Sequence, residues 1–565
     1  MTCGIRFGPR LAPLALGAVF ALLASSPSLA AQAQATTGII RGVVTDPSGN
    51  VVAGARVTVT DVQTQFQRTV VSNEKGVFVA PLLPLGTYDV TARAVGLGER
   101  KQTGIVLRVG ETVDLALKLQ PVELAAVTVT ATPLVDVTKV ETSTRLPNQA
   151  VAGLPNNGRN FLNLTLLTPN VSIVQGPDGD ELTIAGQKGI HNNVSVDGAD
   201  FNNPFFGEQR GGQRPPFTFN LDAVKEMVVV ADGANAEFGR SQSGFVNVIT
   251  KSGTNAMDGT AHFVLKNDSL SSRAKAGDGT TAPKFDSKQY QTGFTFGGPI
   301  VRDRLFYFGA LDIQKASSTK QTDPLRIDAR VVTALAALGS PNENGSIDRT
   351  NDARVLLFKL DYSLSAKNLA NLRYNYTWSE QENGTFDVDT WGRSSNGIEK
   401  DHSNAGNLML ASYLSPAVTN ELRFQYSRED RPRPYGGPRS SALGGNPADP
   451  PAARPFPDTG MDFAYGFRFG LPFFLPIDYY DTRIQVLDNV SIAKRDHLIK
   501  FGVEWNRVNS VQTFIGFANS RYVFGSVTDF LRYVADSTTA GPLLYLQQAG
   551  IDRSVRSVVP DEDHV

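Results

Sequence analysis

Residues 372–379 read Leu-Arg-Tyr-Asn-Tyr-Thr-Trp-Ser, so an apolar or aromatic side chain alternates with a polar one at every step. Residues 422–427 (Leu-Arg-Phe-Gln-Tyr-Ser) and 499–506 (Ile-Lys-Phe-Gly-Val-Glu-Trp-Asn) repeat this alternation. Successive side chains of a strand point to opposite faces, and a membrane barrel presents apolar residues to lipid and polar residues to its lumen. The pattern fits a transmembrane barrel, but a soluble sandwich with one hydrated face has the same period, so periodicity alone leaves both folds open.

Composition and charge exclude some classes of protein. The chain has 565 residues and a formal net charge of 54 − 55 = −1. A nucleic-acid module that works through bulk basicity is therefore excluded, and no nucleic-acid partner is expected. After residue 35 the sequence has no apolar run of the ~18 residues that a helical membrane span needs.

The N-terminus predicts export. Arg6 and Arg10 precede an apolar run at residues 11–24, and Ser28-Leu29-Ala30 supplies the small residues of a cleavage site. Residues 1–30 are therefore predicted to be a signal peptide. The one cysteine is Cys3, inside this leader, so the mature chain should have neither a thiol nor a disulfide.

Residues 37–120 form the first block after the leader and predict a small β-sandwich. Turn residues such as Asp46-Pro47-Ser48-Gly49-Asn50 separate its short β-rich segments. The predicted strands are residues 40–45, 56–62, 67–72, 77–80, 86–94, 101–108 and 111–119.

A linker follows at residues 121–145. Its segment 126–133 reads Ala-Val-Thr-Val-Thr-Ala-Thr-Pro, an extended and β-branched stretch. Such a segment can add as a strand to the exposed sheet edge of a partner. A plain linker and a final strand of the sandwich are the alternatives.

Residues 146–252 predict a mixed α/β domain. A turn cluster at residues 155–160 precedes Phe161, Leu164 and Leu167, whose spacing predicts a short helix. The predicted strands of this domain are residues 183–186, 193–197, 224–230 and 245–250.

Ordered motifs in two blocks resemble known families. Residues 42–46, 54–59, 73–78 and 84–90 resemble the carboxypeptidase regulatory-like domain, a transthyretin-like sandwich with a carbohydrate-binding-like fold. A second set resembles the plug domain of TonB-dependent outer-membrane receptors of the Oar-like subgroup. It comprises residues 154–161 (Leu-Pro-Asn-Asn-Gly-Arg-Asn-Phe), 194–198, 236–244 and 246–255, and residues 297–300 and 304–308 resemble the first barrel hairpins.

The resemblance implies a mainly β fold: an N-terminal sandwich in the periplasm, an α/β plug, and part of an antiparallel barrel in the bacterial outer membrane. It implies import of a saccharide, peptide or iron chelate. The implied partners are a TonB-type inner-membrane energy transducer, outer-membrane lipid and an unidentified extracellular ligand. An Oar-like surface protein used for adhesion or secretion is the alternative.

The resemblance also assigns site residues. The TonB box candidate is Val127, Thr128, Val129, Thr130, Ala131 and Thr132, and the plug motif is Asp197, Gly198, Glu237, Gly239 and Gly244. Ligand contacts at the plug apex are predicted for Asn202, Asn203, Arg210 and Arg214.

No catalytic residue, cofactor or metal site is predicted, because the five histidines are scattered and no nucleophile motif occurs. The polar run that contains Asp197 and Asp200 can supply ligands for a hard cation, but turn chemistry explains it better.

The barrel block is predicted to be incomplete. Residues 259–565 hold nine or ten alternating segments, whereas barrels with a plugged lumen have about 22 strands. The last residues, 558–565, are acidic and turn-like. We therefore expect a truncated receptor with a curved, half-open sheet around a well-formed plug. The predicted spans are residues 260–266, 289–296, 304–313, 354–363, 370–379, 406–414, 419–427, 482–492, 498–508 and 520–525.

Overall fold

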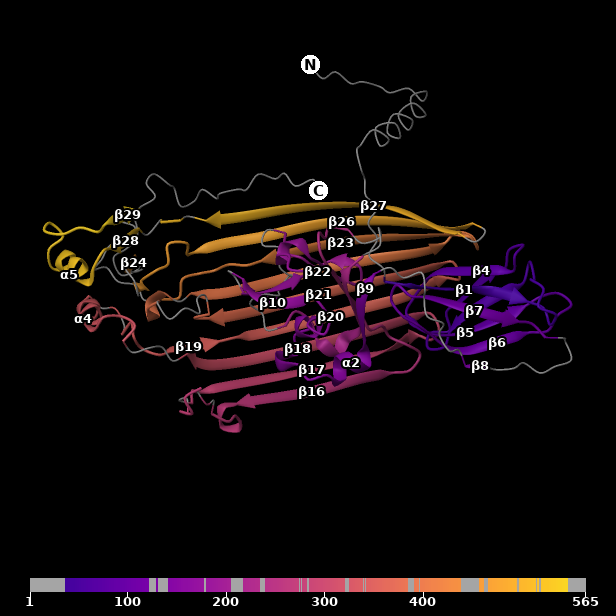
Figure 1. Ribbon diagram of the computed structural model, residues 1–565, viewed down its shortest axis with the longest axis horizontal. Coiled ribbons are helices and arrows are strands. Elements are labelled where there is room, and N and C mark those ends of the chain that lie inside the picture. The colour runs from indigo at the N-terminus through magenta and orange to yellow at the C-terminus, as the bar shows by residue number, and fades with distance from the viewer. Residues whose placement is uncertain are drawn as a thin grey trace, which may run out of the picture.

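In the computed structural model the N-terminal sandwich lies beside one end of a large sheet, and an α/β domain packs against that sheet (Figure 1). The structure describes residues 36–120, 129–130, 141–176, 179–204, 217–233, 239–273, 275, 277–281, 284–320, 325–338, 340, 342–384, 391–395, 397–437, 457–461, 466–494, 497–514, 516–517 and 520–546. The leader at residues 1–30 lies outside this range.

The sandwich has two sheets, ordered β4-β1-β7 and β3-β2-β5-β6-β8. Alternate residues of its strands are buried, as the period of 2 requires, and their side chains form one apolar core between the sheets. Its strands are β1 (Gly38–Thr45), β2 (Arg56–Asp61), β3 (Gln67–Val71), β4 (Val77–Leu83), β5 (Gly86–Arg93), β6 (Arg100–Leu107), β7 (Thr112–Lys118) and β8 (Val129–Thr130).

Strand β8 lies within the TonB box candidate. Val129 and Thr130 pair in parallel with Gln102 and Thr103 of β6, so this part of the segment is the last strand of the sandwich sheet. The other box residues, Val127, Thr128, Ala131 and Thr132, lie outside the described residues.

The α/β domain is built on a sheet of order β13-β12-β15-β14-β9, and the predicted helix is a single turn, α3. Its elements are β9 (Thr142–Pro147), α2 (Asn148–Gly153), α3 (Leu162–Thr165), β10 (Val171–Gly176), β11 (Gly179–Ile184), β12 (Asn193–Val196), β13 (Ala199–Asp200), η3 (Leu221–Ala223), β14 (Val224–Asp232) and β15 (Phe245–Thr250).

The large sheet confirms the predicted alternation. On β21 the apolar residues Leu372 and Tyr374 are exposed on the outer face, while Arg373 and Asn375 are buried on the inner face against the α/β domain. Its strands are β16 (Asp258–Asn267), β17 (Ser287–Val301), β18 (Leu305–Lys320), β19 (Ile347–Thr350), β20 (Asp352–Ser365), β21 (Asn368–Glu382), β22 (Ile398–Tyr413), β23 (Val418–Asp430), β26 (Ile477–Lys494) and β27 (His497–Phe514).

Nine predicted spans correspond to long strands of this sheet, but the tenth was wrong. Residues 520–525 contain β28 (Arg521–Phe524), which pairs in parallel with β24 (Asp458–Met461) in a separate four-stranded sheet. In the part of the chain that the structure describes, the large sheet runs from β16 at one edge to β27 at the other, and β16 and β27 are not paired with each other.

The two ends of the large sheet differ. At one end, beside the sandwich, the connections β17–β18, β20–β21 and β22–β23 are tight turns. At the other, long-loop end, segments from two connections, β18–β19 and β23–β26, fold together with the residues that follow β27 into what we call the cap (Figure 1). The cap comprises α4 (Ala329–Ala337), β24, β25 (Arg468–Phe469), β28, α5 (Val527–Ala535) and β29 (Leu544–Leu546). Among the described residues no helix is long and apolar enough to cross a membrane.

Candidate functional site

The functional site suggested by the fold is the junction between the α/β domain and the inner face of the large sheet. A tight turn, Asp197-Gly198, joins β12 to β13, and both residues have positive φ (46° and 73°). This turn meets strands β20, β21 and β23 of the sheet. Short polar residues and glycine adopt this geometry most readily, which explains the sequence of the turn.

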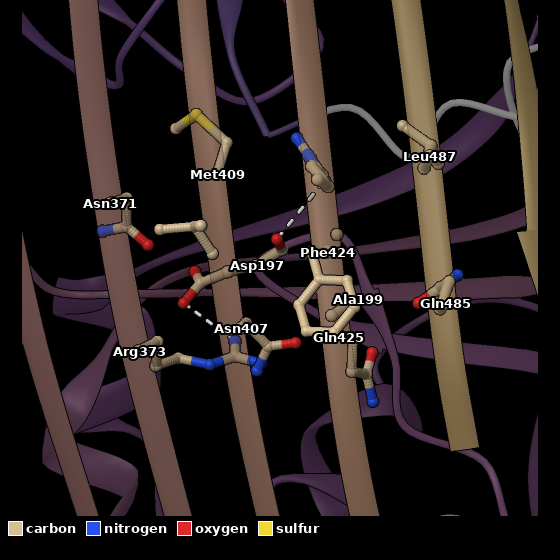
Figure 2. A pocket seen from close by; sticks show the side chains of 13 residues that line it. Asp197, Ala199, Asn371, Arg373, Asn407, Met409, Phe424, Gln425, Gln485 and Leu487 are labelled. Carbon is tan, nitrogen blue, oxygen red and sulfur yellow. Dashed lines mark hydrogen bonds and ion pairs between the residues drawn. The ribbon is translucent and has the colours of Figure 1, made fainter.

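Asp197 is held by bonds from its own α/β domain and from the large sheet. Its carboxylate accepts hydrogen bonds from the backbone N–H of Thr250 (2.8 Å) and its hydroxyl (2.6 Å). Arg373 Nη1 of the sheet lies 2.9 Å from Asp197 Oδ2, and Lys359 Nζ lies 3.8 Å from it. Figure 2 shows Arg373 pointing toward Asp197 across the junction.

The charge state of Asp197 follows from these contacts. Burial alone would raise its pKa, but Lys359, Arg373 and the two bonds from Thr250 outweigh burial and bring the pKa well below its ordinary value. The carboxylate therefore stays ionised and keeps its attraction for the sheet at any physiological pH.

A small cavity lies beside this turn. Its volume is ≈ 20 Å³, room for about one water molecule. Arg423 of β23 borders it and donates from Nη1 to the carbonyl of Asp197 (3.3 Å). The amide of Asn407 also lines it and has no hydrogen-bond partner among the described residues, so the cavity has the polar character that a bridging water requires.

Asp200 makes a second connection to the sheet. Its carboxylate is fully buried and forms ion pairs with Arg240 of its own domain and with Arg483 of β26. Its backbone N–H donates to Gln485 Oε1 (3.2 Å), and Gln425 Nε2 donates to its carbonyl (3.0 Å). Two strands of the large sheet, β23 and β26, are therefore bonded to β13.

The predicted apex residues Asn202 and Asn203 are buried at the same junction. Asn202 bonds within its own domain, and its carbonyl accepts from Arg483 Nη2 (3.2 Å). Asn203 Nδ2 donates to Glu429 Oε2 (2.9 Å) and Asp481 Oδ2 (3.2 Å) of the sheet. The bonds described for both side chains are internal, and a ligand role for them stays a prediction. Arg210 and Arg214 lie outside the described residues.

The remaining plug-motif residues support the strand β12. The carbonyl of Gly239 accepts from Asn193 Nδ2 (2.8 Å), and that of Gly244 accepts from the Asn193 N–H (3.1 Å). A side chain at Gly244 would collide with Ile184. Glu237 lies outside the described residues.

A histidine bridge fixes the opposite side of the α/β domain. His262 of β16 lies between Asp222 (Nδ1 to Oδ2, 2.8 Å) and Asp312 of β18 (Nε2 to Oδ2, 3.3 Å), and Arg159 Nη2 also bonds Asp222 (2.6 Å). Burial alone would raise the pKa of Asp222, but the bonds from His262 and Arg159 lower it to about 2.

Sequence reasoning placed His262 among scattered histidines and missed this bridge. Arg373 and Arg423 of the large sheet occupy inward positions of the period-2 pattern, which is the one signal that marks them in the sequence. Among the described residues, no group of three or more His, Cys, Asp or Glu side chains is placed to hold a metal ion.

The cap lies at the long-loop end of the large sheet and has its own apolar core. Side chains from or next to α4, β24, β25, β28 and α5 pack together there; they include Ile327, Val331, Leu335, Met461, Phe467, Phe469, Phe524 and Phe530. Asp458 of β24 is buried beneath this core, with Arg521 Nε 3.7 Å from its carboxylate.

Burial raises the pKa of Asp458 to about 6, against the opposing effect of Arg521 and Arg468. A raised pKa means that the folded cap binds the proton more tightly than the unfolded chain, whose pKa is about 3.9. We therefore expect the cap to be most stable below pH ~4 and to lose about 3 kcal/mol, mostly between pH ~4 and pH ~6. Hydrogen exchange of β24 and β28 at pH 4 and pH 8 measures this.

Asp458→Asn is the matched control for that experiment. It keeps the acceptor for the Phe473 N–H and has no titrating proton, so exchange in its cap should no longer depend on pH beyond intrinsic chemistry. Equal protection of the wild-type cap at both pH values would contradict the prediction.

Comparison with known proteins adds the following. Residues 39–120 match the carboxypeptidase regulatory-like domain family, and residues 249–337 and 320–538 match the family described as outer membrane beta barrel domain. The chain is 28% identical to the TonB-dependent transporter Oar of Myxococcus xanthus, over 53% of this chain and 29% of that protein. The chain thus spans less than a third of the length of this curated relative.

Two solved structures are similar to part of this chain. The outer membrane transporter YddB from Escherichia coli is similar over 68% of this chain and 50% of its own (13% identity, TM-score 0.48). The siderophore receptor PirA from Acinetobacter baumannii is similar over 66% of this chain and 48% of its own (14% identity, TM-score 0.43). The named relatives are transporters and receptors, which are not enzymes.

Proposed function

Since the chain belongs to the outer membrane β-barrel family, lies in the bacterial outer membrane and is a relative of the Oar-like TonB-dependent receptors, we propose that it acts in energy-coupled import of a large nutrient. In this proposal the large sheet is barrel wall, the α/β domain is the plug that closes the lumen, and the sandwich faces the periplasm.

The observation that carries the proposal is the set of ion pairs and hydrogen bonds between plug and wall, which accompanies two small apolar clusters around Ala223 and Phe217. The Asp197-Gly198 turn and Asp200 bind the wall through Arg373, Arg423 and Arg483. Ion pairs and hydrogen bonds can be exchanged for water, whereas an apolar core cannot. A plug that must rearrange and return in each transport cycle needs a contact of this kind.

The outer face of the wall supports placement in lipid. Its strands expose apolar side chains in neighbouring rows, which would be costly in water but are stable against acyl chains. Examples with more than two-fifths of their surface exposed are Leu372, Phe424, Ile499 and Trp505. The short-turn end then faces the periplasm and the long-loop end with its cap faces outward.

The coupling partner is proposed to be a TonB-type transducer that pairs with residues 127–132. The pairing of Val129 and Thr130 with the β6 edge supports this, because it places a strand-forming segment on an exposed sheet edge from which a competing strand can take it. A pull on that segment acts next on β9, the edge strand of the plug sheet.

The ligand is proposed to be a saccharide, a peptide or an iron chelate. Arg210 and Arg214 remain the proposed apex contacts for an anionic group, and Asn202 and Asn203 the proposed polar contacts. For the two asparagines to meet a ligand, their bonds to the wall have to be exchanged, which would couple ligand binding to release of the plug.

Val129→Pro tests the coupling. Proline removes a backbone donor and fixes φ, so strand pairing at this position is lost. We expect the purified periplasmic domain of a TonB-type transducer to bind the solubilised variant roughly tenfold more weakly or worse, since each lost backbone bond contributes about 1 kcal/mol and its neighbours are displaced.

Val137→Pro is the matched control, because it places the same substitution in the same linker outside residues 127–132. Transducer binding should be unchanged in this variant. Loss of binding in Val137→Pro alone would move the coupling segment, and no transducer binding by the wild-type protein would favour the adhesion or secretion role.

A further inference from the structure

The plug sheet is apolar on both faces. Every residue of β15 is buried, and so are seven of the nine residues of β14, which is typical of strands covered on two sides. One face, with Met227, Val229, Val246 and Val248, packs on the core of the plug itself. The opposite face needs a second cover.

The N-terminal sandwich supplies that cover. Leu85 and Val109 of the sandwich form one apolar cluster with four side chains of the plug sheet: Val228, Val230, Phe245 and Ile249. Neither Leu85 nor Val109 belongs to the sandwich's own core. Their apolar character is therefore explained by the contact with the plug.

Polar bonds fix the orientation of the two layers. Lys225 Nζ donates to the carbonyl of Leu85 (2.5 Å), and the Val109 N–H donates to Glu226 Oε2 (3.4 Å). A third bond runs from the Asn255 N–H to the carbonyl of Gln63 (3.1 Å).

The sandwich also touches the wall. Tyr413, at the short-turn end of β22, stacks on Phe66 (ring centroids 5.8 Å) and donates its hydroxyl to the carbonyl of Leu82 (2.7 Å). The guanidinium of Arg68 lies 4.4 Å from the centre of the same ring. The sandwich is thus held both by the plug sheet and by the wall.

We propose that the N-terminal sandwich is the periplasmic layer of the plug: it covers the second apolar face of the plug sheet and keeps the closed plug folded in the lumen. This function for the domain rests on the assignment of the α/β domain as a plug. It requires no ligand of the sandwich. A plug without this layer would expose four large apolar side chains to the periplasm.

The test compares two valines three residues apart. Val109 is buried in the contact with the plug, whereas Val106 on β6 has 54% of its surface exposed. We expect Val109→Asp to raise the rate of proteolytic cleavage within residues 146–252 roughly tenfold or more in isolated outer membranes, because cleavage follows the population of the opened plug. Val106→Asp should be cleaved like the wild type.

A milder variant keeps the test informative if Val109→Asp does not fold. Val109→Ala removes only two methyl groups from the contact and should raise cleavage of the plug by a smaller factor in the same direction. As a second readout, cells that make Val109→Asp should become sensitive to vancomycin, a large antibiotic that an intact plug excludes.

The proposal is overturned if Val109→Ala and Val109→Asp both leave plug cleavage and vancomycin exclusion at wild-type values. If Val109→Asp is absent from the membrane, the result for Val109→Ala decides. Neither readout involves the transducer or a transported ligand, so failure here is distinguishable from failure of the import function, which Val129→Pro tests.

Discussion

Replacing Asp197 by Ala should release the plug from the wall. The carboxylate is the point on which Arg373, Lys359 and both Thr250 donors converge, and Arg373 and Lys359 are almost fully buried. Removing one partner of a buried ion pair leaves charge in a poorly solvated place, which destabilises by about 3 kcal/mol or more. The urea concentration at which the plug becomes cleavable by protease should fall accordingly.

Asp232→Ala is the matched control, because Asp232 is an exposed aspartate at the end of β14 in the same domain. Its urea midpoint should equal that of the wild type. Asp197→Asn should lie between the two, since an amide oxygen can still accept from Thr250 but carries no charge for the arginine. Equal midpoints for Asp197→Ala and Asp232→Ala would show that the turn does not hold the plug.

The pH dependence of this effect has a definite sign. The pKa of Asp197 is lowered in the folded protein, so its stabilising contribution is present above the unfolded pKa of about 3.9 and is lost only as the pH falls toward the lower folded value. The difference between wild type and Asp197→Ala should therefore be the same at pH 5 and pH 8, unlike the stability of the cap.

The wall could be predicted from sequence because its rule is local. A period of 2 in strands such as β21 follows directly from apolar residues facing out and polar residues facing in. The predicted spans were too short: residues 482–492 stand for β26, Ile477–Lys494, because the ends of long strands leave the apolar belt and lose the pattern. The β28 strand was assigned to the wrong sheet, since alternation does not identify a strand's neighbours.

The junction could be predicted only in part. The Asp197-Gly198 turn has a local signature, but its partner Arg373 is 176 residues away, and no local rule selects that residue among the inward-facing ones. The cover of the plug sheet by the sandwich also has a signature in the sequence. The run Met227-Val228-Val229-Val230-Ala231 does not alternate, and a strand without alternation is covered on both faces.

Gly198→Ala should weaken the same junction by a different route. With φ at +73°, an alanine here is strained by ~1–2 kcal/mol. Its Cβ would also collide with the Arg423 guanidinium and approach Thr36 to 2.9 Å, and forcing atoms into a packed contact adds about 1–3 kcal/mol. We expect plug cleavage at clearly lower urea than in the wild type.

Gly186 separates the two contributions. It belongs to the same domain, has a φ of +75° and has no atom within 4 Å of the position that a Cβ would take, so Gly186→Ala reports the backbone strain alone. The urea midpoint of Gly198→Ala should therefore lie well below that of Gly186→Ala. We attribute the excess to the collision with Arg423. Gly198→Ala should therefore lower the urea midpoint less in an Arg423→Ala background than in the wild type, so the effects of the two substitutions are non-additive. Strict additivity would mean that the Arg423 guanidinium does not rest against the turn.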